Sequence, residues 1–318
     1  MDDLRQLPRF DDSLSYLYLE HVRIEQHDKA IAFHDGQSLT PVPAASLALL
    51  MLGPGTSITH AAVKALASNN CTVVWVGEEG LRFYAAGIGG TRGSAALLRQ
   101  AALVSHPRLR LAVVMRMYRK RFPAELDPEL TLQQIRGMEG IRVREAYATA
   151  SKATGVAWSG RRYERGNWAA ADPVNRALSC GNACLYGLVQ AAMLSAGYSS
   201  ALGFIHTGKQ LSFVYDIADL YKADLVIPTA FEVAAWQTAS VEREMRVACR
   251  RKFQEARLMQ RILPDIADVL DVGELPLPAD EPAWDAESAA PGALWEPDGP
   301  TGPEGRVEGG VNYGPDDA

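Results

Sequence analysis

The sequence predicts an α+β protein, with a β-sandwich-like domain that holds one short helix, then an all-α domain and a disordered C-terminal tail. Up to about residue 86, β-branched and aromatic residues recur in short alternating runs, as in strands. From Ser94 to about Leu270, apolar residues recur at i, i+3 and i+4, which indicates amphipathic helices. Proline, glycine and acidic residues dominate after residue 272.

These changes of pattern set the expected domain boundaries. We expect the domains at residues 1–88, 94–272 and 273–318, with a glycine-rich linker at 89–93 between the first two. The segment GIGGTRGS at 87–94 also resembles a phosphate-binding loop, but it lacks the lysine and hydroxyl residue that end such loops. A linker is therefore the preferred interpretation.

The composition narrows the class of protein. The chain has 318 residues, of which 47% are hydrophobic and 22% charged, as in ordinary globular proteins. Its net charge is −6, but residues 272–318 hold eleven acidic residues and one arginine, so this segment carries −10 and the remainder +4. A mildly basic body permits a nucleic-acid partner. Four cysteines and no run of eighteen apolar residues favour a cytoplasmic protein without disulfides or a membrane span.

The N-terminal domain is read as strands separated by turns. Residues 15–27 alternate, and residues 30–43 form a hairpin around Asp35-Gly36. A short helix follows the apolar run at 46–59, with Thr59 as its N-cap and Asn69 near its end. Residues 71–87 give two strands around Gly-Glu-Glu-Gly.

Six helices are expected in the second domain. The helix that opens at Asp172-Pro173 is apolar nearly all round, so it should lie at the centre. We expect the next helix to stop at Pro228 and the last one to end near Pro264. Their expected ranges are 97–105, 108–122, 131–155, 172–197, 212–227 and 240–263.

Two acids lie in a segment that otherwise belongs in a core. Asp216 and Asp219 stand about 60° apart on one helical face, among residues such as Phe213 and Ile217. Buried carboxylates are costly unless they are paired, hydrogen-bonded or bound to a cation. The alternative is that one is a surface acid and the other pairs with Lys209 or Lys222.

Glu139 and His206 complete an unusual set. Glu139 occupies the apolar stripe of its helix, which indicates either a functional carboxylate, an error in the helix phase, or an ion pair with Arg142. His206 precedes the aspartate helix, where it could be a ligand or a hydrogen-bonded loop residue. Carboxylates with one imidazole suit Mg²⁺ or Mn²⁺. Cys180 and Cys184 have no nearby histidines and are read as packed small residues.

Basic residues suggest contacts with nucleic acid. Arg243, Arg246, Arg250 and Arg257 fall on one face of the last helix, where they form either a phosphate track or a solvated face with Glu242 and Glu244. Arginines and aromatic residues alternate in WSGRRYERGNW at 158–168, which is typical of single-strand sites and also compatible with an ordinary loop.

Three motifs in this order resemble a known family. MEGIRVR at 138–144, DPVNRALSCGNACLYG at 172–187 and GFIHTGKQLSFVYDIADLYKAD at 203–224 are similar to the CRISPR-associated integrase of spacer acquisition, type I-E subtype. The resemblance covers roughly residues 8–272 and leaves the tail out. It implies an N-terminal β-sandwich, a helical catalytic domain and a homodimer that works with a small ferredoxin-like adaptation protein bridging two dimers.

The resemblance also implies roles for single residues. Glu139, His206 and Asp219 would bind a divalent metal, Mg²⁺ or Mn²⁺, and Asp216 would be an essential neighbour or a fourth ligand. The contacts to DNA would come from Arg82, Tyr163, Trp168, Tyr186, Lys209, Arg243, Arg246 and Arg250. The expected reaction is attack by a DNA 3′-hydroxyl on a phosphodiester at the edge of a CRISPR repeat. The alternative is a non-catalytic DNA-binding scaffold, and a small phosphate-ester hydrolase is disfavoured because no phosphate-cradling loop is evident.

Overall fold

The computed structural model describes residues 14–28, 30–80, 83–87, 94–161 and 172–272, together with 294–295 and 306–307. The strands are β1 (Leu14–Leu19), β2 (Arg23–His27), β3 (Ala30–His34), β4 (Leu39–Val42), β5 (Leu47–Leu52), β6 (Ser57–Ile58), β7 (Thr72–Val76), β8 (Phe83–Ala86), β9 (Leu294–Trp295) and β10 (Arg306–Val307). The helices are α1 (His60–Ser68), α2 (Ala95–Ser105), α3 (Pro107–Lys120), α4 (Leu132–Thr154), α5 (Pro173–Ser195), α6 (Ser212–Ala218), α7 (Ile227–Ala235), α8 (Val241–Glu255) and α9 (Leu258–Leu270). Short turns of other helix types lie at Ala44–Ser46, Glu78–Gly80 and Lys222–Val226.

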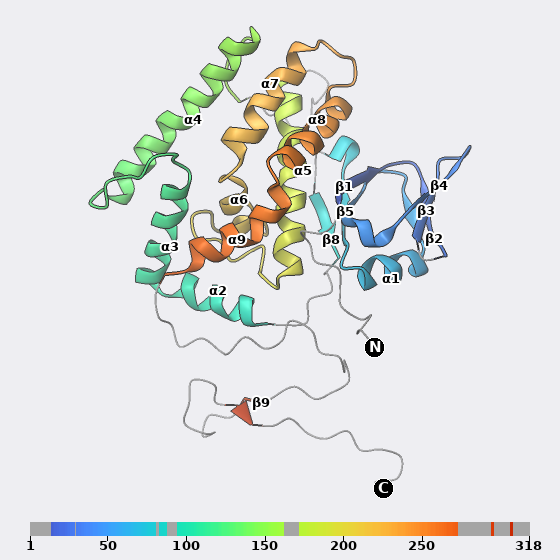
Figure 1. Cartoon of the computed structure of the whole chain (residues 1–318), viewed down its shortest axis with the longest axis horizontal. Coiled ribbons are helices and arrows are strands. Elements are labelled where there is room, and N and C mark those ends of the chain that lie inside the picture. The colour runs from blue at the N-terminus through green and yellow to red at the C-terminus, as the bar shows by residue number, and fades with distance from the viewer. Residues whose placement is uncertain are drawn as a thin grey trace.

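The N-terminal strands form two four-stranded sheets. One has the order β1-β5-β7-β8, with β1, β5 and β7 parallel and β8 antiparallel to β7. The other has the order β4-β3-β2-β6 and is antiparallel except for the β2–β6 pair. Both sheets and α1 contribute side chains to one apolar core. The expected β-sandwich-like arrangement with a short helix is confirmed, and the helices lie to its left in Figure 1.

Strand β5 connects the two cores of the molecule. All six residues of LALLML are buried, and their side chains alternate between the faces of the sheet. Leu50 and Leu52 belong to the core shared with the second sheet. Leu49 and Met51 belong to the larger core that also contains the helices. The continuous apolar run therefore reflects a strand that is covered on both faces.

Helix α5 is the centre of the helical part, as its sequence predicts. Asp172 is its N-cap and accepts from the N–H of Asn175 at 2.8 Å, while Pro173 opens the first turn. In Figure 1, α5 lies at the centre of the helices and next to the sheet β1-β5-β7-β8. It is the one described helix long and apolar enough to cross a membrane, but 78% of that window is buried within the protein. Burial of this kind fits a core helix.

Two proline-based expectations are wrong. Pro228 opens α7 rather than closing the preceding helix, because the first turn of a helix has no acceptor for the N–H that proline lacks. Pro264 lies inside α9, where six buried residues, among them Ile262 and Ile266, offset its cost of about 3 kcal/mol. The chain breaks instead at Arg257, whose φ is +48°. The expected helix at 240–263 is thus two helices, α8 and α9.

Other local expectations are confirmed. The Thr59 side chain caps α1 by accepting from the N–H of Ala62, and Asn69 is its C-cap. Strands β3 and β4 form the hairpin around Asp35-Gly36, with Gly36 at a φ of +91°. The glycine-rich linker at 89–93 lies outside the described residues. So does most of the tail, of which the structure describes only the antiparallel pair β9–β10.

Candidate functional site

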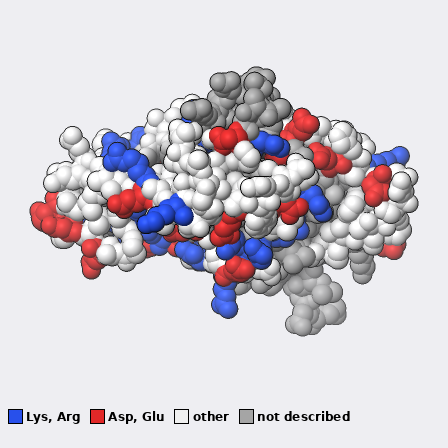
Figure 2. Space-filling view, turned by 90° about the horizontal axis from the view of Figure 1, so that it is seen from above, with Lys and Arg blue, Asp and Glu red and all other residues white. Residues whose placement is uncertain are grey.

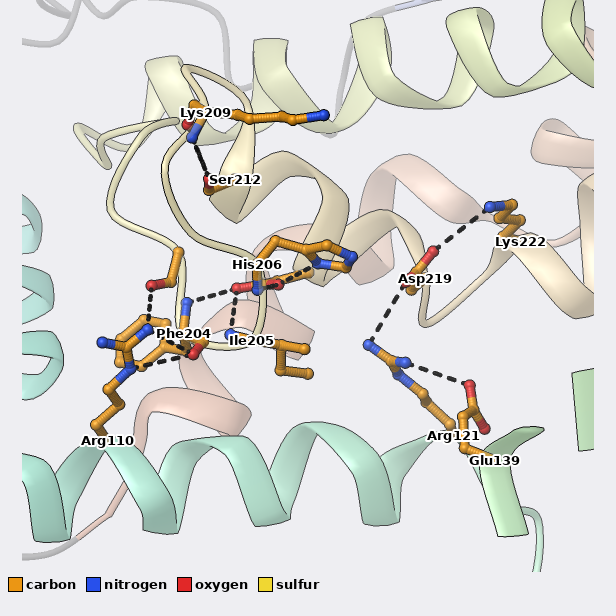
Figure 3. A network of polar contacts seen from close by, with 12 residues as sticks. Arg110, Arg121, Glu139, Phe204, Ile205, His206, Lys209, Ser212, Asp219 and Lys222 are labelled. Carbon is orange, nitrogen blue, oxygen red and sulfur yellow. Dashed lines mark hydrogen bonds and ion pairs between the residues drawn. The ribbon is translucent and has the colours of Figure 1, made fainter. Parts of the chain in front are cut away.

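Three segments that are well separated in the sequence supply the candidate site. Glu139 comes from the middle of α4, and Asp216 lies in α6. Asp219 is the C-cap residue of α6, and His206 lies in the loop before it. Arg121, the C-cap residue of α3, extends between Glu139 and Asp219 in Figure 3. The structure therefore pairs His206 with Asp216 and links Glu139 to Asp219 through an arginine that the sequence analysis did not select.

Asp216 is the most tightly held of the four. Its side chain is fully buried. It accepts hydrogen bonds from the backbone N–H groups of Phe204 at 2.6 Å, Ile205 at 3.1 Å and His206 at 2.8 Å. The His206 ring adds a bond from Nδ1 at 2.7 Å. These four bonds answer the question that a buried acid raises, since both of its oxygens are occupied by donors.

The hydrogen bond to Asp216 selects the tautomer of the neutral His206 ring. An ionised carboxylate only accepts, so Nδ1 of the ring is the donor and Nε2 keeps its lone pair when the ring is neutral. The same hydrogen bond raises the pKa of His206 above its ordinary value. The ring is 42% exposed, and in Figure 3 it faces the side on which Asp219 lies. A histidine held in this way by a carboxylate is typical of metal ligands.

Basic side chains hold the other two carboxylates. Glu139 accepts from Arg142 through Nε at 2.7 Å and Nη2 at 3.1 Å, and from Nη1 of Arg121 at 3.2 Å. Nη2 of Arg121 lies 3.9 Å from Asp219, whose other oxygen is 3.8 Å from Nζ of Lys222. Arg121 is 4% exposed, so its guanidinium is a buried cation between two acids.

The donor set fits a hard divalent cation in chemistry. Two carboxylates and one imidazole are the ligands that Mg²⁺ and Mn²⁺ accept. Within the part of the chain that the structure describes, no three of the acidic, histidine or cysteine side chains stand close enough to enclose an ion. The reason is visible in Figure 3, where Arg121 lies between Glu139 and Asp219. Binding of an ion would therefore require the side chain of Arg121 to move.

The alternatives left open by the sequence are partly present as well. Glu139 does pair with Arg142, and Asp219 does pair with Lys222. Glu139 is 9% exposed, so its place in the apolar stripe was no error of phase. The expected pairing of an aspartate with Lys209 is absent for Asp216, whose described partners are those of the His206 loop.

A cavity of about 410 Å³ opens beside the site. Its wall includes Tyr186 and Tyr215, whose rings meet edge to face at 5.0 Å, and the Lys222 that pairs with Asp219. Tyr215 also meets the His206 ring edge on, at 5.8 Å. Burial raises the pKa of Tyr186, so its phenol stays protonated and is unsuited to act as a nucleophile. The strands β5, β7 and β8 close the opposite wall.

The expected DNA-contacting residues fall into three groups. Arg82, Tyr163 and Trp168 lie outside the described residues. Lys209 is exposed, and its backbone N–H donates to Ser212 Oγ at 3.1 Å (Figure 3). The remaining three arginines lie on α8, and Tyr186 lines the cavity.

The arginines of α8 do not form one solvent-facing row. Arg243 is 73% exposed. The guanidinium carbon of Arg246 lies 4.4 Å from the centre of the Tyr18 ring, and that of Arg250 lies 5.3 Å from Tyr16. Arg250 also donates to the Tyr16 carbonyl at 2.8 Å. These two arginines therefore tie α8 to β1, and Arg257 lies beyond the end of α8.

The solvated-face alternative for α8 is also wrong in part. Glu242 is 3% exposed and accepts two bonds of 2.7 Å from Arg176 of α5. On the face drawn in Figure 2, basic and acidic side chains are interspersed rather than separated into fields. Cys180 and Cys184 are buried and free, in agreement with their reading as packed residues.

Comparison with known proteins identifies the family that the chain resembles. The family model described as CRISPR associated protein Cas1 matches residues 119–251. The "CRISPR-associated endonuclease Cas1 2" of Thermus thermophilus is 54% identical over 99% of this chain and 94% of that protein. The "CRISPR-associated endonuclease Cas1" of Escherichia coli is 44% identical over 88% of this chain and 91% of that protein. The crystal structure of a TtCas1–DNA complex matches with a TM-score of 0.80 at 53% identity, over 94% of this chain and all of that chain.

The sheets and the helices that pack on them thus form an architecture shared with proteins of CRISPR systems. The chain belongs to the family of the CRISPR-associated protein Cas1.

Proposed function

We propose that this protein is a metal-dependent DNA endonuclease and integrase of the type I-E subtype, which inserts captured foreign DNA into a CRISPR array. Family membership and the endonuclease names of its relatives support this proposal. The observation that carries it is the His206 ring, whose Nδ1 is bonded to a buried carboxylate while its other nitrogen stays available beside Asp219.

Glu139, His206 and Asp219 are the residues that would hold Mg²⁺ or Mn²⁺. When bound, the ion supplies a Lewis acid that polarises a phosphoryl oxygen and lowers the pKa of an attacking hydroxyl or water. Asp216 is a positioning residue rather than a direct ligand, because its oxygens are already occupied by backbone and ring donors. Arg121 and Lys222, both within ion-pair distance of Asp219, can bind phosphate oxygens once they turn away from it.

The reaction is a transesterification. The 3′-hydroxyl oxygen of a DNA fragment forms a bond to phosphorus at the edge of a repeat, and the bond from phosphorus to the leaving 3′-oxygen breaks. Water in place of the hydroxyl gives hydrolysis at the same site, so one site accounts for both activities.

The DNA contacts are proposed for the residues expected from the sequence. Tyr186 lines the cavity beside the site, and Lys209 lies on the exposed loop after His206, where each can meet a strand that enters. Arg243 on α8 is exposed and pairs with Glu244 at 3.6 Å, a surface contact that it would exchange for a phosphate. Arg246 and Arg250 would first have to leave the tyrosines of β1, which weakens the case for them. Arg82, Tyr163 and Trp168 rest on the resemblance alone.

The assembly is proposed on the same resemblance. The protein would act in the cytoplasm as a homodimer, with a small ferredoxin-like adaptation protein between two dimers. Its DNA partners would be duplexes with 3′-hydroxyl ends and the CRISPR repeat. We also propose domains at 1–88 and 94–272, joined by a linker at 89–93 and followed by a tail at 273–318.

A strand-joining assay tests the function. The protein is incubated with its adaptation partner, Mn²⁺, a short duplex with 3′-hydroxyl ends and a supercoiled plasmid that carries the repeat. We expect joined products from the wild type and none from D219A, with folding and DNA affinity retained because the Asp219 side chain is 24% exposed and held only by long ion pairs. Equal joining by D219A would refute the proposed metal site.

The same variant separates the enzyme from a non-catalytic scaffold. If the acids are only structural, D219A should lower the melting temperature and DNA binding together, and the wild type should give no joined product. Loss of joining alone is the signature of a catalytic group.

A further inference from the structure

The loop that carries His206 is held from behind by helices α2 and α3. Gln100 of α2 is fully buried, and its side chain makes three hydrogen bonds to this loop. Nε2 donates to the carbonyls of Ser199 and Leu202 at 2.9 Å each, and Oε1 accepts from the N–H of Ser199 at 2.8 Å. The start of the loop is therefore fixed to α2.

Arg110 of α3 holds the part of the loop nearest the histidine. Its Nε and Nη2 donate to the carbonyl of Phe204 at 3.1 Å and 2.9 Å, and Nη2 also approaches the carbonyl of Gly203 at 3.4 Å. Figure 3 shows the guanidinium on one side of Phe204 and the His206 ring on the other. Arg110 is half-buried, and within the described residues its side chain donates to these loop carbonyls.

The same turn has its N–H groups directed at Asp216. Phe204 is bound at both ends of its backbone, with its N–H on the carboxylate and its C=O on the guanidinium. The peptide groups therefore lie between a negative and a positive charge, with their dipoles aligned favourably with both. The turn also requires glycine at 203, because a Cβ there would overlap the carbonyl oxygen of His206 and the side chain of Ser212.

We propose that Arg110 is a positioning residue for His206, acting through the backbone of residues 203–206 and Asp216 to present Nε2 of the ring toward the metal. The proposal rests on the proposed function in so far as His206 is a metal ligand. Arg110 holds the carbonyl groups of residues 203 and 204, and this orients the N–H groups of residues 204–206. Those N–H groups hold the Asp216 carboxylate in hydrogen-bond distance of Nδ1 of His206. Loss of the guanidinium frees the loop carbonyls and weakens the bond that selects the tautomer.

The chain offers a matched control on the same helix. Arg116 of α3 also bonds across to another helix, with Nε on the carbonyl of Asp268 at 3.0 Å and Nη2 on its carboxylate at 2.8 Å. That contact is exposed and belongs to α9, away from the His206 loop. R116M removes an arginine of similar reach without touching residues 203–206.

The experiment compares the wild type, R110M, R110K and R116M by two readouts. The first is the nitrogen NMR spectrum of ¹⁵N-histidine-labelled protein at a pH where the His206 ring is neutral, which reports the tautomer without any metal. The second is calorimetric titration with Mn²⁺ alone. We expect R110M to show a mixed tautomer and about 10- to 100-fold weaker Mn²⁺ binding. R110K, which keeps one donor to the Phe204 carbonyl, should lie between R110M and the wild type, and R116M should match the wild type.

The outcomes are distinguishable. A wild-type tautomer and Mn²⁺ affinity within twofold in both R110M and R110K would overturn the proposal. If R110M fails to fold, R110K decides it by the same spectrum. If the wild type binds no Mn²⁺, the proposed metal site fails, while the tautomer spectra still establish or overturn the role of Arg110. Equal losses in R116M and R110M would show general destabilisation of α3 and would also overturn it.

Discussion

The two halves of the candidate site are held by different kinds of partner. Asp216 and, through it, His206 are bound by three backbone N–H groups of one short loop. Glu139 and Asp219 are bound by arginine and lysine side chains. Backbone groups cannot leave unless the loop unfolds, whereas a side chain can change rotamer while the backbone stays in place. The histidine half is therefore preorganised, and the glutamate half can rearrange when a ligand enters.

The hydrogen-bond inventory shows the same contrast. Both oxygens of Asp216 have donors. Arg121 is buried at the other half, yet its Nε and Nη2 atoms have no hydrogen-bond partner among the described residues. Burying guanidinium donors without hydrogen-bond partners costs free energy, so little is lost when the side chain changes its position. The comparison therefore indicates that Arg121 is the side chain of this site that moves most easily when a ligand enters.

The largest expected effect comes from substituting two aspartates three residues apart on the same segment. D216A leaves three N–H groups, one buried and two partly buried, without their acceptor, so we expect a loss of about 3 kcal/mol in the free energy of unfolding. D219A removes only two long ion pairs, so its loss should stay below about 1 kcal/mol. Urea unfolding curves measure both values. Equal losses would remove the distinction between the two halves.

A double-mutant cycle sharpens the description of the glutamate half. Arg121 and Glu139 are both buried and joined at 3.2 Å, so R121M and E139Q should show a coupling free energy of about 1–2 kcal/mol. The partner cycle, R121M with D219N, concerns a contact of 3.9 Å and should give below about 0.5 kcal/mol. Urea unfolding of the single and double variants gives both numbers. A stronger coupling to Asp219 would mean that Arg121 belongs to the aspartate rather than to the glutamate.

The smallest effect expected for a single substitution concerns an exposed ion cluster on the outer side of α3. The hydrogen bond from Lys120 holds the pKa of Asp268 below its ordinary value. A lowered pKa stabilises the fold above the ordinary value for aspartate, and this contribution disappears as the pH falls through the lower folded value. Because Asp268 is 49% exposed, D268N should cost about 0.5 kcal/mol at pH 7.

Melting curves of D268N and the wild type at pH 7, and again in acid below the pKa of Asp268, measure that difference. The two proteins should converge in acid, and at pH 7 high salt should also bring them together because exposed charges are screened. A difference that grows in acid would contradict the assignment.

The sequence predicted the parts of the fold that depend on local chemistry. Thr59 was recognised as an N-cap because a short polar side chain precedes an apolar helical pattern, and Asp172-Pro173 was recognised as the opening of a helix. Pro228 and Pro264 were misread, because proline does not say whether it opens a helix, ends one or is tolerated within one. That outcome depends on burial elsewhere, which a local pattern does not contain.

The acids of the candidate site were predicted because they interrupt apolar stripes, and burial of Glu139 and Asp216 agrees with that signal. The arginines that contact them were harder to foresee. Arg121 belongs to the basic run YRKRF, where nothing distinguishes an inward arginine from its exposed neighbours. Arg110 acts on carbonyl groups more than ninety residues later in the chain, and carbonyls leave no mark in a sequence.

Strand β5 has a practical consequence for anyone who wishes to study this protein in pieces. Leu49 packs against α5, and a Cβ on Gly187 of that helix would already crowd its side chain at 3.0 Å. A fragment that ends before α2 would leave Leu49 and Met51 in water, and one that begins there would strip a wall from the cavity beside His206. Neither half is expected to stay soluble alone. The separate contributions of the β part and the helical part must therefore be measured with point substitutions in the intact chain.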